Sequence, residues 1–167
     1  SDLFPQAAPG DATRLVGDLL VREEVFAKPS PWAQFAAGVD VRANTHDQVD
    51  GSPGGGVIDD RGLKRPVVAI RRLSATLNRG PFTLDLGKQF IRWGKTDIVT
   101  PTDRFAPRDF LNVIDTELLP VTGVRAGTRV GDGQLDLVWV PFLTPSRVPL
   151  FGQRWAVVPA RSEEHTS

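Results

Sequence analysis

The chain has 167 residues, in which 20 Lys and Arg balance 20 Asp and Glu, with two His and no Cys, Met or Tyr. A net charge of zero argues against a nucleic-acid-binding domain, which needs a basic surface. The absence of Cys excludes disulfides, thiolate nucleophiles and cysteine zinc sites. The 16 Gly and 14 Pro, with 40% apolar residues, indicate a turn-rich but folded chain. No apolar run reaches the length of a transmembrane helix.

The two ends of the sequence differ from its middle. Ser1–Gly10 is polar and contains Pro, so it lacks the apolar centre of a signal peptide. We expect that a signal was removed or that the start of the frame is missing. The last seven residues, RSEEHTS, resemble the translation of a sequencing-adapter oligonucleotide, which implies a frame truncated near Ala160; a charged disordered tail is the alternative. We therefore predict a flexible segment 1–13, a partial β-barrel 14–160 and a non-native tail 161–167.

Six segments alternate between apolar and polar side chains with the period of two that is typical of β-strands. The separation is complete in 32–44, where Phe35, Val39 and Val41 oppose Asp40 and Arg42. The six predicted strands are 14–27, 32–44, 67–78, 82–93, 122–130 and 134–142, and a seventh is expected to begin near Trp155.

Three charged residues fall on the apolar side of their predicted strands. They are Glu23 in the first strand, Arg71 in the third and Lys88 in the fourth. A charge on the apolar side of a strand is tolerated most easily near a strand end. These three positions are therefore the exceptions that a structure must explain.

The connections between the predicted strands alternate between short and long. The short ones contain Pro or Gly, and Gly131-Asp132-Gly133 is typical of a hairpin turn. The long ones are 45–66, 94–121 and 143–154. This rhythm predicts three hairpins whose tight turns lie at one end of a sheet and whose long loops lie at the other.

Alternating strands of this length, with tight turns at one end and long loops at the other, are the sequence signature of outer-membrane β-barrels. Lipid offers no hydrogen bonds, so such a sheet must close on itself and turn its apolar face outward. We predict an all-β fold: an antiparallel up-and-down transmembrane β-barrel, of which this chain is the N-terminal fragment with about six to seven strands. The alternative is a soluble or secreted β-sandwich or lipocalin-like ligand-binding module, whose apolar faces pack together.

The stretch LGKQFIRWGKTD, residues 86–97, followed by DRFAPRD, residues 103–109, resembles a Gram-negative outer-membrane porin-like family. That family comprises large uncharacterised porin-like barrels and, more loosely, alginate-export-type porins. The likeness covers Leu86–Asp109 and, more loosely, extends through Phe151. The resemblance implies an outer-membrane location and a channel or transport role.

The charged and amide side chains of the polar strand faces are the candidate pore-lining residues. They are Asp18, Arg22, Asp40, Arg42, Arg72, Asp85, Gln89, Arg125 and Arg129. Loops as long as 94–121 are often functional, so we expect this segment to fold into the barrel mouth and narrow the pore; a plain external loop is the alternative. The candidate constriction residues are Asp97, Asp103, Arg104, Arg108 and Asp109.

Within the same segment, apolar residues recur at roughly helical spacing, and Asp109 is placed to cap a helix. These residues are Phe110, Val113, Ile114 and Leu118. The spacing predicts a short helix between Pro107 and Pro120.

The expected function is the passage of small polar solutes across the bacterial outer membrane. The expected partners are outer-membrane lipid and these solutes, without nucleic acid, and a homo-oligomer is left open. We expect no enzymatic reaction, no cofactor and no metal.

Overall fold

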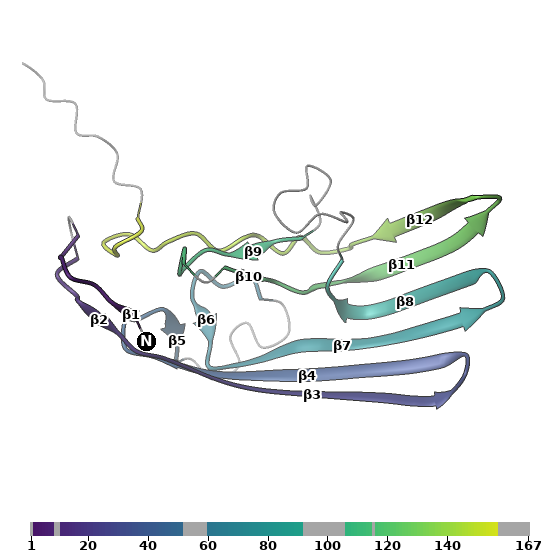
Figure 1. Cartoon of the computed structure of the whole chain (residues 1–167), viewed down its shortest axis with the longest axis horizontal. Helices are drawn as coiled ribbons and strands as arrows, with labels where there is room; N and C mark the ends of the chain where they lie inside the picture. The colour runs from purple at the N-terminus through teal and green to yellow at the C-terminus, as the bar shows by residue number, and fades with distance from the viewer. Residues whose placement is uncertain (1, 9–10, 52–59, 92–105, 115, 157–167) are drawn as a thin grey trace, which may run out of the picture.

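The computed structural model is all-β and is dominated by one antiparallel sheet of six strands (Figure 1). It describes residues 2–8, 11–51, 60–91, 106–114 and 116–156. The strands of the sheet are β3 (Asp18–Ser30), β4 (Ala33–Asn44), β7 (Val68–Arg79), β8 (Phe82–Gln89), β11 (Val121–Val130) and β12 (Gly133–Trp139). Their spatial order, β12-β11-β8-β7-β4-β3, follows the chain, so each strand pairs with its predecessor. The six predicted antiparallel strands are thereby confirmed.

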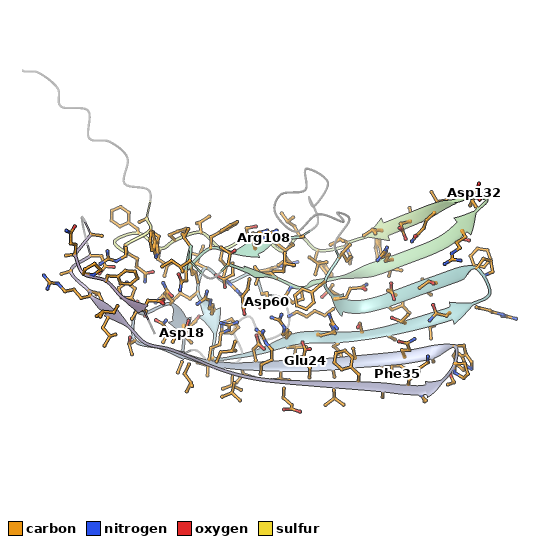
Figure 2. The ribbon with its side chains drawn as sticks, in the orientation of Figure 1. Asp18, Glu24, Phe35, Asp60, Arg108 and Asp132 are labelled. Carbon is orange, nitrogen blue, oxygen red and sulfur yellow. The ribbon has the colours of Figure 1, made fainter. Side chains whose placement is uncertain are left out.

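Three short pairs of strands gather at one end of the sheet (Figure 1). They are β1 (Asp2–Leu3) with β2 (Leu15–Val16), β5 (Val49–Asp50) with β6 (Arg65–Pro66), and β9 (Arg108–Asp109) with β10 (Glu117–Leu118). Only β5 and β6 are parallel. The tight turns of the three hairpins lie at the opposite end, and Asp132 marks the tip of the β11–β12 turn (Figure 2). Gly80 and Gly131 supply the positive φ that two of these turns require.

The sheet is open, as expected of a fragment that holds only part of a barrel's strands. Its outermost strands β3 and β12 each have one neighbour in the sheet and do not pair with each other. The expected seventh strand is not seen in the part of the chain that the structure describes, where Trp155 lies in a turn. Among the described residues, no helix is long and apolar enough to cross a membrane.

The two faces of the sheet differ in chemistry, with Glu23 a charged exception on the outer face. On the outer face, apolar side chains point away from the rest of the protein; Val21, Leu73 and Leu137 are 57%, 58% and 71% exposed. On the inner face lie charged side chains that the loops partly cover, and Asp40 is only 5% exposed. The described residues therefore bury charge and expose hydrocarbon, the reverse of an ordinary soluble core.

Two backbone irregularities explain two of the three misplaced charges. Arg71 is an extra residue in β7, because Gly38 of β4 pairs with Arg72 while Val39 pairs with Ile70. A β-bulge of this kind lets two consecutive side chains share one face, so Arg71 and Arg72 both lie on the inner side.

The second irregularity is at Gly87 of β8, whose φ of +108° is open only to Gly. The next residue, Lys88, is 5% exposed and reaches inward to Asp60. Phe90 follows on the same side, where its ring lies against Arg71 and Arg72. Glu23 keeps its predicted outward position, opposite Val39.

The hairpins of the sheet are staggered by a constant step. One row of paired residues runs through Phe35, Ala75, Leu86 and Val124. The distance of each of these residues from the tight turn of its own hairpin can be counted along the chain. Phe35 is three positions from Trp32, Ala75 is five from Gly80, Leu86 is five from Pro81 and Val124 is seven from Gly131. The stagger is therefore two residues per hairpin, or one per strand. In a closed barrel, one residue of shear per strand corresponds to a strand tilt of about 36°.

The helix predicted between Pro107 and Pro120 is wrong. The described residues there form β9, a bend and β10. Asp109 Oδ1 accepts a hydrogen bond from the Leu111 N–H, and Asn112 Oδ1 accepts one from the Ile114 N–H. Such local side-chain bonds stabilise turns at the expense of a helix.

Candidate functional site

The candidate site is the inner face of the six-stranded sheet together with the loops that cover one end of it. Most of its charged side chains project from strands by simple alternation. Arg22 and Asp40, which are directly paired across β3 and β4, lie with their side chains in contact. The pairing register of the strands therefore places these oppositely charged side chains next to each other.

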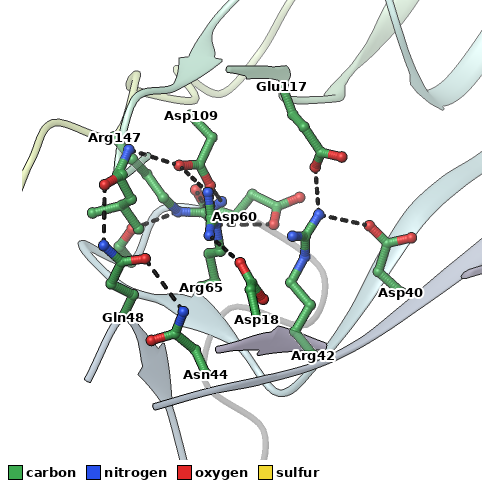
Figure 3. Close-up of polar contacts among 12 residues, drawn as sticks. Asp18, Asp40, Arg42, Asn44, Gln48, Asp60, Arg65, Asp109, Glu117 and Arg147 are labelled. Atoms are coloured by element: carbon green, nitrogen blue, oxygen red, sulfur yellow. Dashed lines mark hydrogen bonds and ion pairs between the residues drawn. The ribbon is translucent and has the colours of Figure 1, made fainter. Parts of the chain in front are cut away.

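The first group of ion pairs links two strands to the loop between β8 and β11. Arg22 donates to Asp40 with Nε and Oδ1 2.8 Å apart, and to Glu117 of β10 with Nη2 and Oε1 3.1 Å apart. Arg42 donates to both Asp40 and Glu117. Figure 3 shows Glu117 reaching down to Arg42 from the opposite side of the network. The described end of the β8–β11 loop is thus held against the inner faces of β3 and β4.

The second group, here called the buried ion network, comprises Asp60, Arg65, Lys88, Asp109 and Arg147. Figure 3 labels all of these except Lys88. Every one of its side chains is at most 5% exposed. Asp109 accepts from Arg65 at 2.8 and 3.1 Å and from Arg147 at 3.1 Å. Asp60 lies 2.6 Å from Lys88 Nζ and 3.2 Å from Arg147.

The buried ion network joins all three long connections to the sheet. Asp60 and Arg65 come from the segment between β4 and β7, Asp109 from the segment between β8 and β11, and Arg147 from the segment after β12. Lys88 belongs to the sheet itself. Removing one member of such a cluster leaves an uncompensated charge buried among the others, so the network holds the loops cooperatively.

Two carboxyl groups that the β8–β11 loop contributes, those of Asp109 and Glu117, have lowered pKa values. Burial by itself would raise the pKa of Asp109, but the hydrogen bond and charge of Arg65, with smaller contributions from the Leu111 N–H and Arg147, hold the pKa of that carboxyl below its usual value. Burial likewise opposes ionisation of Glu117, and the charges of Arg42 and Arg22 outweigh it and lower its pKa.

Beyond the networks, the inner face opens into a hollow of about 330 Å³. Its wall carries Arg72 of β7, Gln89 of β8 and Arg125 of β11. The Arg72 guanidinium lies 5.8 Å from the centre of the Phe26 ring and 5.3 Å from that of Phe90. The hollow combines cationic, amide and aromatic groups on rigid strands.

Nearer the tight turns, a second hollow of about 220 Å³ contains Asp85, Arg125, Arg129 and Asp136. Arg125 Nη2 of β11 lies 3.2 Å from Asp136 Oδ2 of β12. Asp136 is paired with Gly127 of β11, two residues along from Arg125. Asp85 accepts a hydrogen bond of 2.6 Å from the Thr76 hydroxyl. Charges of both signs therefore line this end of the face.

The predicted site residues fall into four groups. Asp18, Arg22, Asp40, Arg42 and Asp109 take part in the ion pairs described above, Asp18 through a 3.3 Å contact with Arg65. Arg72, Asp85, Gln89, Arg125 and Arg129 line the two hollows. Arg108 lies on β9, half-buried. Asp97, Asp103 and Arg104 lie outside the described residues.

Several residues of the site were not predicted. Asp60, Arg65 and Arg147 stand in irregular segments that carry no periodic signal, and Glu117 was not singled out from its loop. Lys88 did carry a signal, because a charge out of phase in an alternating strand marks a place where the backbone turns a side chain to the other face.

Within the described part of the chain, no three His, Asp or Glu side chains gather in a group that could hold a metal ion. No protein-family model matches the chain, and no curated protein or solved structure is significantly similar to it.

Proposed function

We propose that this chain is part of the wall of a porin-like β-barrel in the bacterial outer membrane, and that its inner face lines a path for small polar solutes. The observation that carries the proposal is the reversal of the two faces. Large apolar side chains on every strand of the sheet are exposed on the outer face, whereas Asp40, Arg65 and Lys88 are at most 5% exposed on the inner side.

The outer face has the chemistry that lipid requires. A side chain such as Leu137 is unfavourable in water when many like it lie together. Contiguous exposed apolar patches mark sites of contact with a membrane or with another protein. The strands are 7 to 13 residues long, which brackets the roughly 9 to 11 residues that span the hydrocarbon region when tilted. Trp32, Phe82 and Trp139 are each at least 60% exposed near strand ends, where aromatic girdles lie in such barrels.

The staggered register supports closure into a ring. One residue of shear per strand gives the tilt at which strands close into barrels, and unpaired strand edges are not tolerated in hydrocarbon. In the proposed pore, the free edges of β3 and β12 pair with further strands, supplied by adjoining sequence or by a second copy of this chain.

In this proposal the loop between β8 and β11 narrows the path. Glu117 and Asp109 hold its described end on the inner side of the sheet through Arg42 and Arg65. A loop fixed there would limit the size of the solutes that pass, and the charges beside it would select among ions.

The test is reconstitution. The chain, refolded from urea with short-chain phosphatidylcholine vesicles, should float with the lipid in a density gradient, gain β-structure only in the presence of lipid or detergent, and make the vesicles leak sorbitol but not a large dextran. A chain that folds as a soluble monomer in buffer and stays out of the lipid fraction would instead be the soluble ligand-binding module, and the pore would be rejected.

A further inference from the structure

Arg72 differs from the other arginines at the centre of the inner face. Arg22, Arg42, Arg71 and Arg125 each lie within ion-pair distance of a carboxylate. No carboxylate of the described residues lies within that distance of Arg72. The Arg72 guanidinium instead stands between two aromatic rings, with its centre 5.8 Å from that of Phe26 and 5.3 Å from that of Phe90.

The bulge in β7 creates this situation. It places two consecutive arginines on one face, and Arg71 takes the nearby acids, with Nε 3.3 Å from Glu24 and Nη1 3.7 Å from Asp40. Phe90 then lies against both guanidinium groups, 4.7 Å from Arg71 and 5.3 Å from Arg72. A cation–π contact stabilises a guanidinium without a carboxylate partner, and a guanidinium carries five N–H donors with which it can bind an anion.

The surroundings of Arg72 favour an anion. The hollow of about 330 Å³ beside it is lined by three cationic side chains, Lys28, Arg72 and Arg125, and by one carboxylate, Asp85. Arg125 is partly neutralised by Asp136, and Asp85 is hydrogen-bonded by Thr76. The excess positive charge therefore concentrates near Arg72, where a guanidinium fork matches the geometry of a carboxylate.

The rest of the lining is suited to hydroxyl groups. Gln34, Gln89 and Ser74 offer amide and hydroxyl groups around the hollow, and the rings of Phe26 and Phe90 offer apolar surface. We infer that this hollow is a subsite for a small hydroxylated carboxylic acid, whose carboxylate pairs with Arg72 and whose hydroxyls bond to the neighbouring amides. The inference deepens the proposed pore and rests on it for the route by which the solute arrives.

The experiment compares two probes of nearly equal size, gluconate and its uncharged counterpart sorbitol. Each is titrated at low ionic strength into the purified chain in detergent micelles, and binding is followed by isothermal calorimetry. Gluconate should bind at least tenfold more tightly than sorbitol, since the net value of a charge-assisted hydrogen bond exceeds that factor. Arg72→Gln should weaken gluconate binding at least tenfold and leave sorbitol unaffected.

Two further variants complete the design. Arg72→Lys keeps the charge but loses the fork, so gluconate should bind with intermediate affinity. Arg79→Gln removes a cation seven positions along β7, outside the hollow, and should leave gluconate affinity within twofold of the unsubstituted chain. Circular dichroism of each variant checks the β-structure, and if Arg72→Gln loses it, the Arg72→Lys titration decides.

The inference is overturned if gluconate does not bind, if sorbitol binds equally well, or if the Arg72 variants bind gluconate as tightly as the unsubstituted chain. Because binding is measured in micelles without transport, its failure is distinct from failure of the pore. Vesicles that stay sealed while gluconate binding persists would reject the pore alone.

Discussion

The reversal of the two sheet faces predicts unequal effects for the same substitution at two adjacent residues. Ala36 and Ala37 are consecutive in β4; Ala36 points inward and is half-buried, whereas Ala37 points outward and is exposed. Replacing each by Arg adds the same charge and nearly the same volume, and only the medium that receives the side chain differs.

The structure sets the depth of Ala37 in the proposed bilayer. Ala37 stands five residues from Trp32, which is exposed beside the tight turn and marks one interface. At about 3.4 Å per residue and a tilt of about 36°, five residues climb roughly 14 Å. That height is close to the middle of an apolar band about 25 Å tall, where an outward Arg costs about 2–4 kcal/mol.

Ala37→Arg should therefore reduce the stability of the lipid-bound state by about 2–4 kcal/mol, a factor of roughly 30 to 1,000 in its folding equilibrium. Ala36→Arg should change it by less than about 1 kcal/mol, because its side chain faces water on the inner side. The assay is urea unfolding of the chain in phosphatidylcholine vesicles, followed by tryptophan fluorescence and checked by flotation. Equal costs at the two positions, or a larger cost at Ala36, would refute the assignment of lipid to the outer face.

Three further predictions concern the ion pairs and the backbone. Asp109→Asn should lower the free energy of unfolding by about 3–5 kcal/mol, because Arg65 then keeps only its contact with Asp18 and Arg147 only its contact with Asp60, and the buried ion network carries an excess positive charge. Glu24→Gln, at a more exposed pair, should lower it by less than about 1 kcal/mol. Urea titration of both variants checks this, and similar losses would contradict it. The pKa values of Asp109 and Glu117 are lowered, so their contribution to stability is complete above the ordinary values of 3.8 and 4.5 and is lost as the pH falls from there through the lower native values. Single-channel conductance should therefore rise on acidification only below these ordinary values, as the loop is released. A conductance that stays constant with falling pH until the chain unfolds would contradict the constriction. Gly87→Ala should lower the free energy of unfolding by at least about 2 kcal/mol, because the added Cβ would come within 2.2 Å of the Leu73 carbonyl oxygen. Gly131→Ala, which has open space around it, should lower it by only about 1 kcal/mol. Thermal or urea unfolding of both variants measures the difference.

The sheet was predictable because its information is local. Successive side chains of a strand point to opposite faces of the sheet, so the apolar or polar character of Phe35 and Asp40 indicates the face of each without reference to any other strand. The hairpin turns are equally local, since Gly131 supplies the backbone conformation where it is needed. These two signals suffice for six strands and their order, but they say nothing about whether the sheet closes.

The loop contacts were not predictable because they depend on distant partners. Asp109 meets Arg65 across 44 residues and Arg147 across 38, and neither arginine lies in a periodic segment. The helical spacing around Phe110 was misleading, because Asp109 and Asn112 form turns with their own side chains. A charge out of phase is the one local sign that the sequence did offer: Arg71 and Lys88 both mark places where the backbone departs from simple alternation.

The loops also bear on the size of the ring in which these strands would close. A barrel of about eight strands has an interior that its own side chains fill. Here the inner side of the sheet holds more than the side chains of its own strands. It also accommodates β9 and β10, and Asp109 of β9 is only 2% exposed. An open hollow lies beside Arg72 as well. A ring that encloses both must be wider than eight strands, so in the proposed pore the six described strands form less than the whole wall. The free edges of β3 and β12 are then the sites where the remaining strands join.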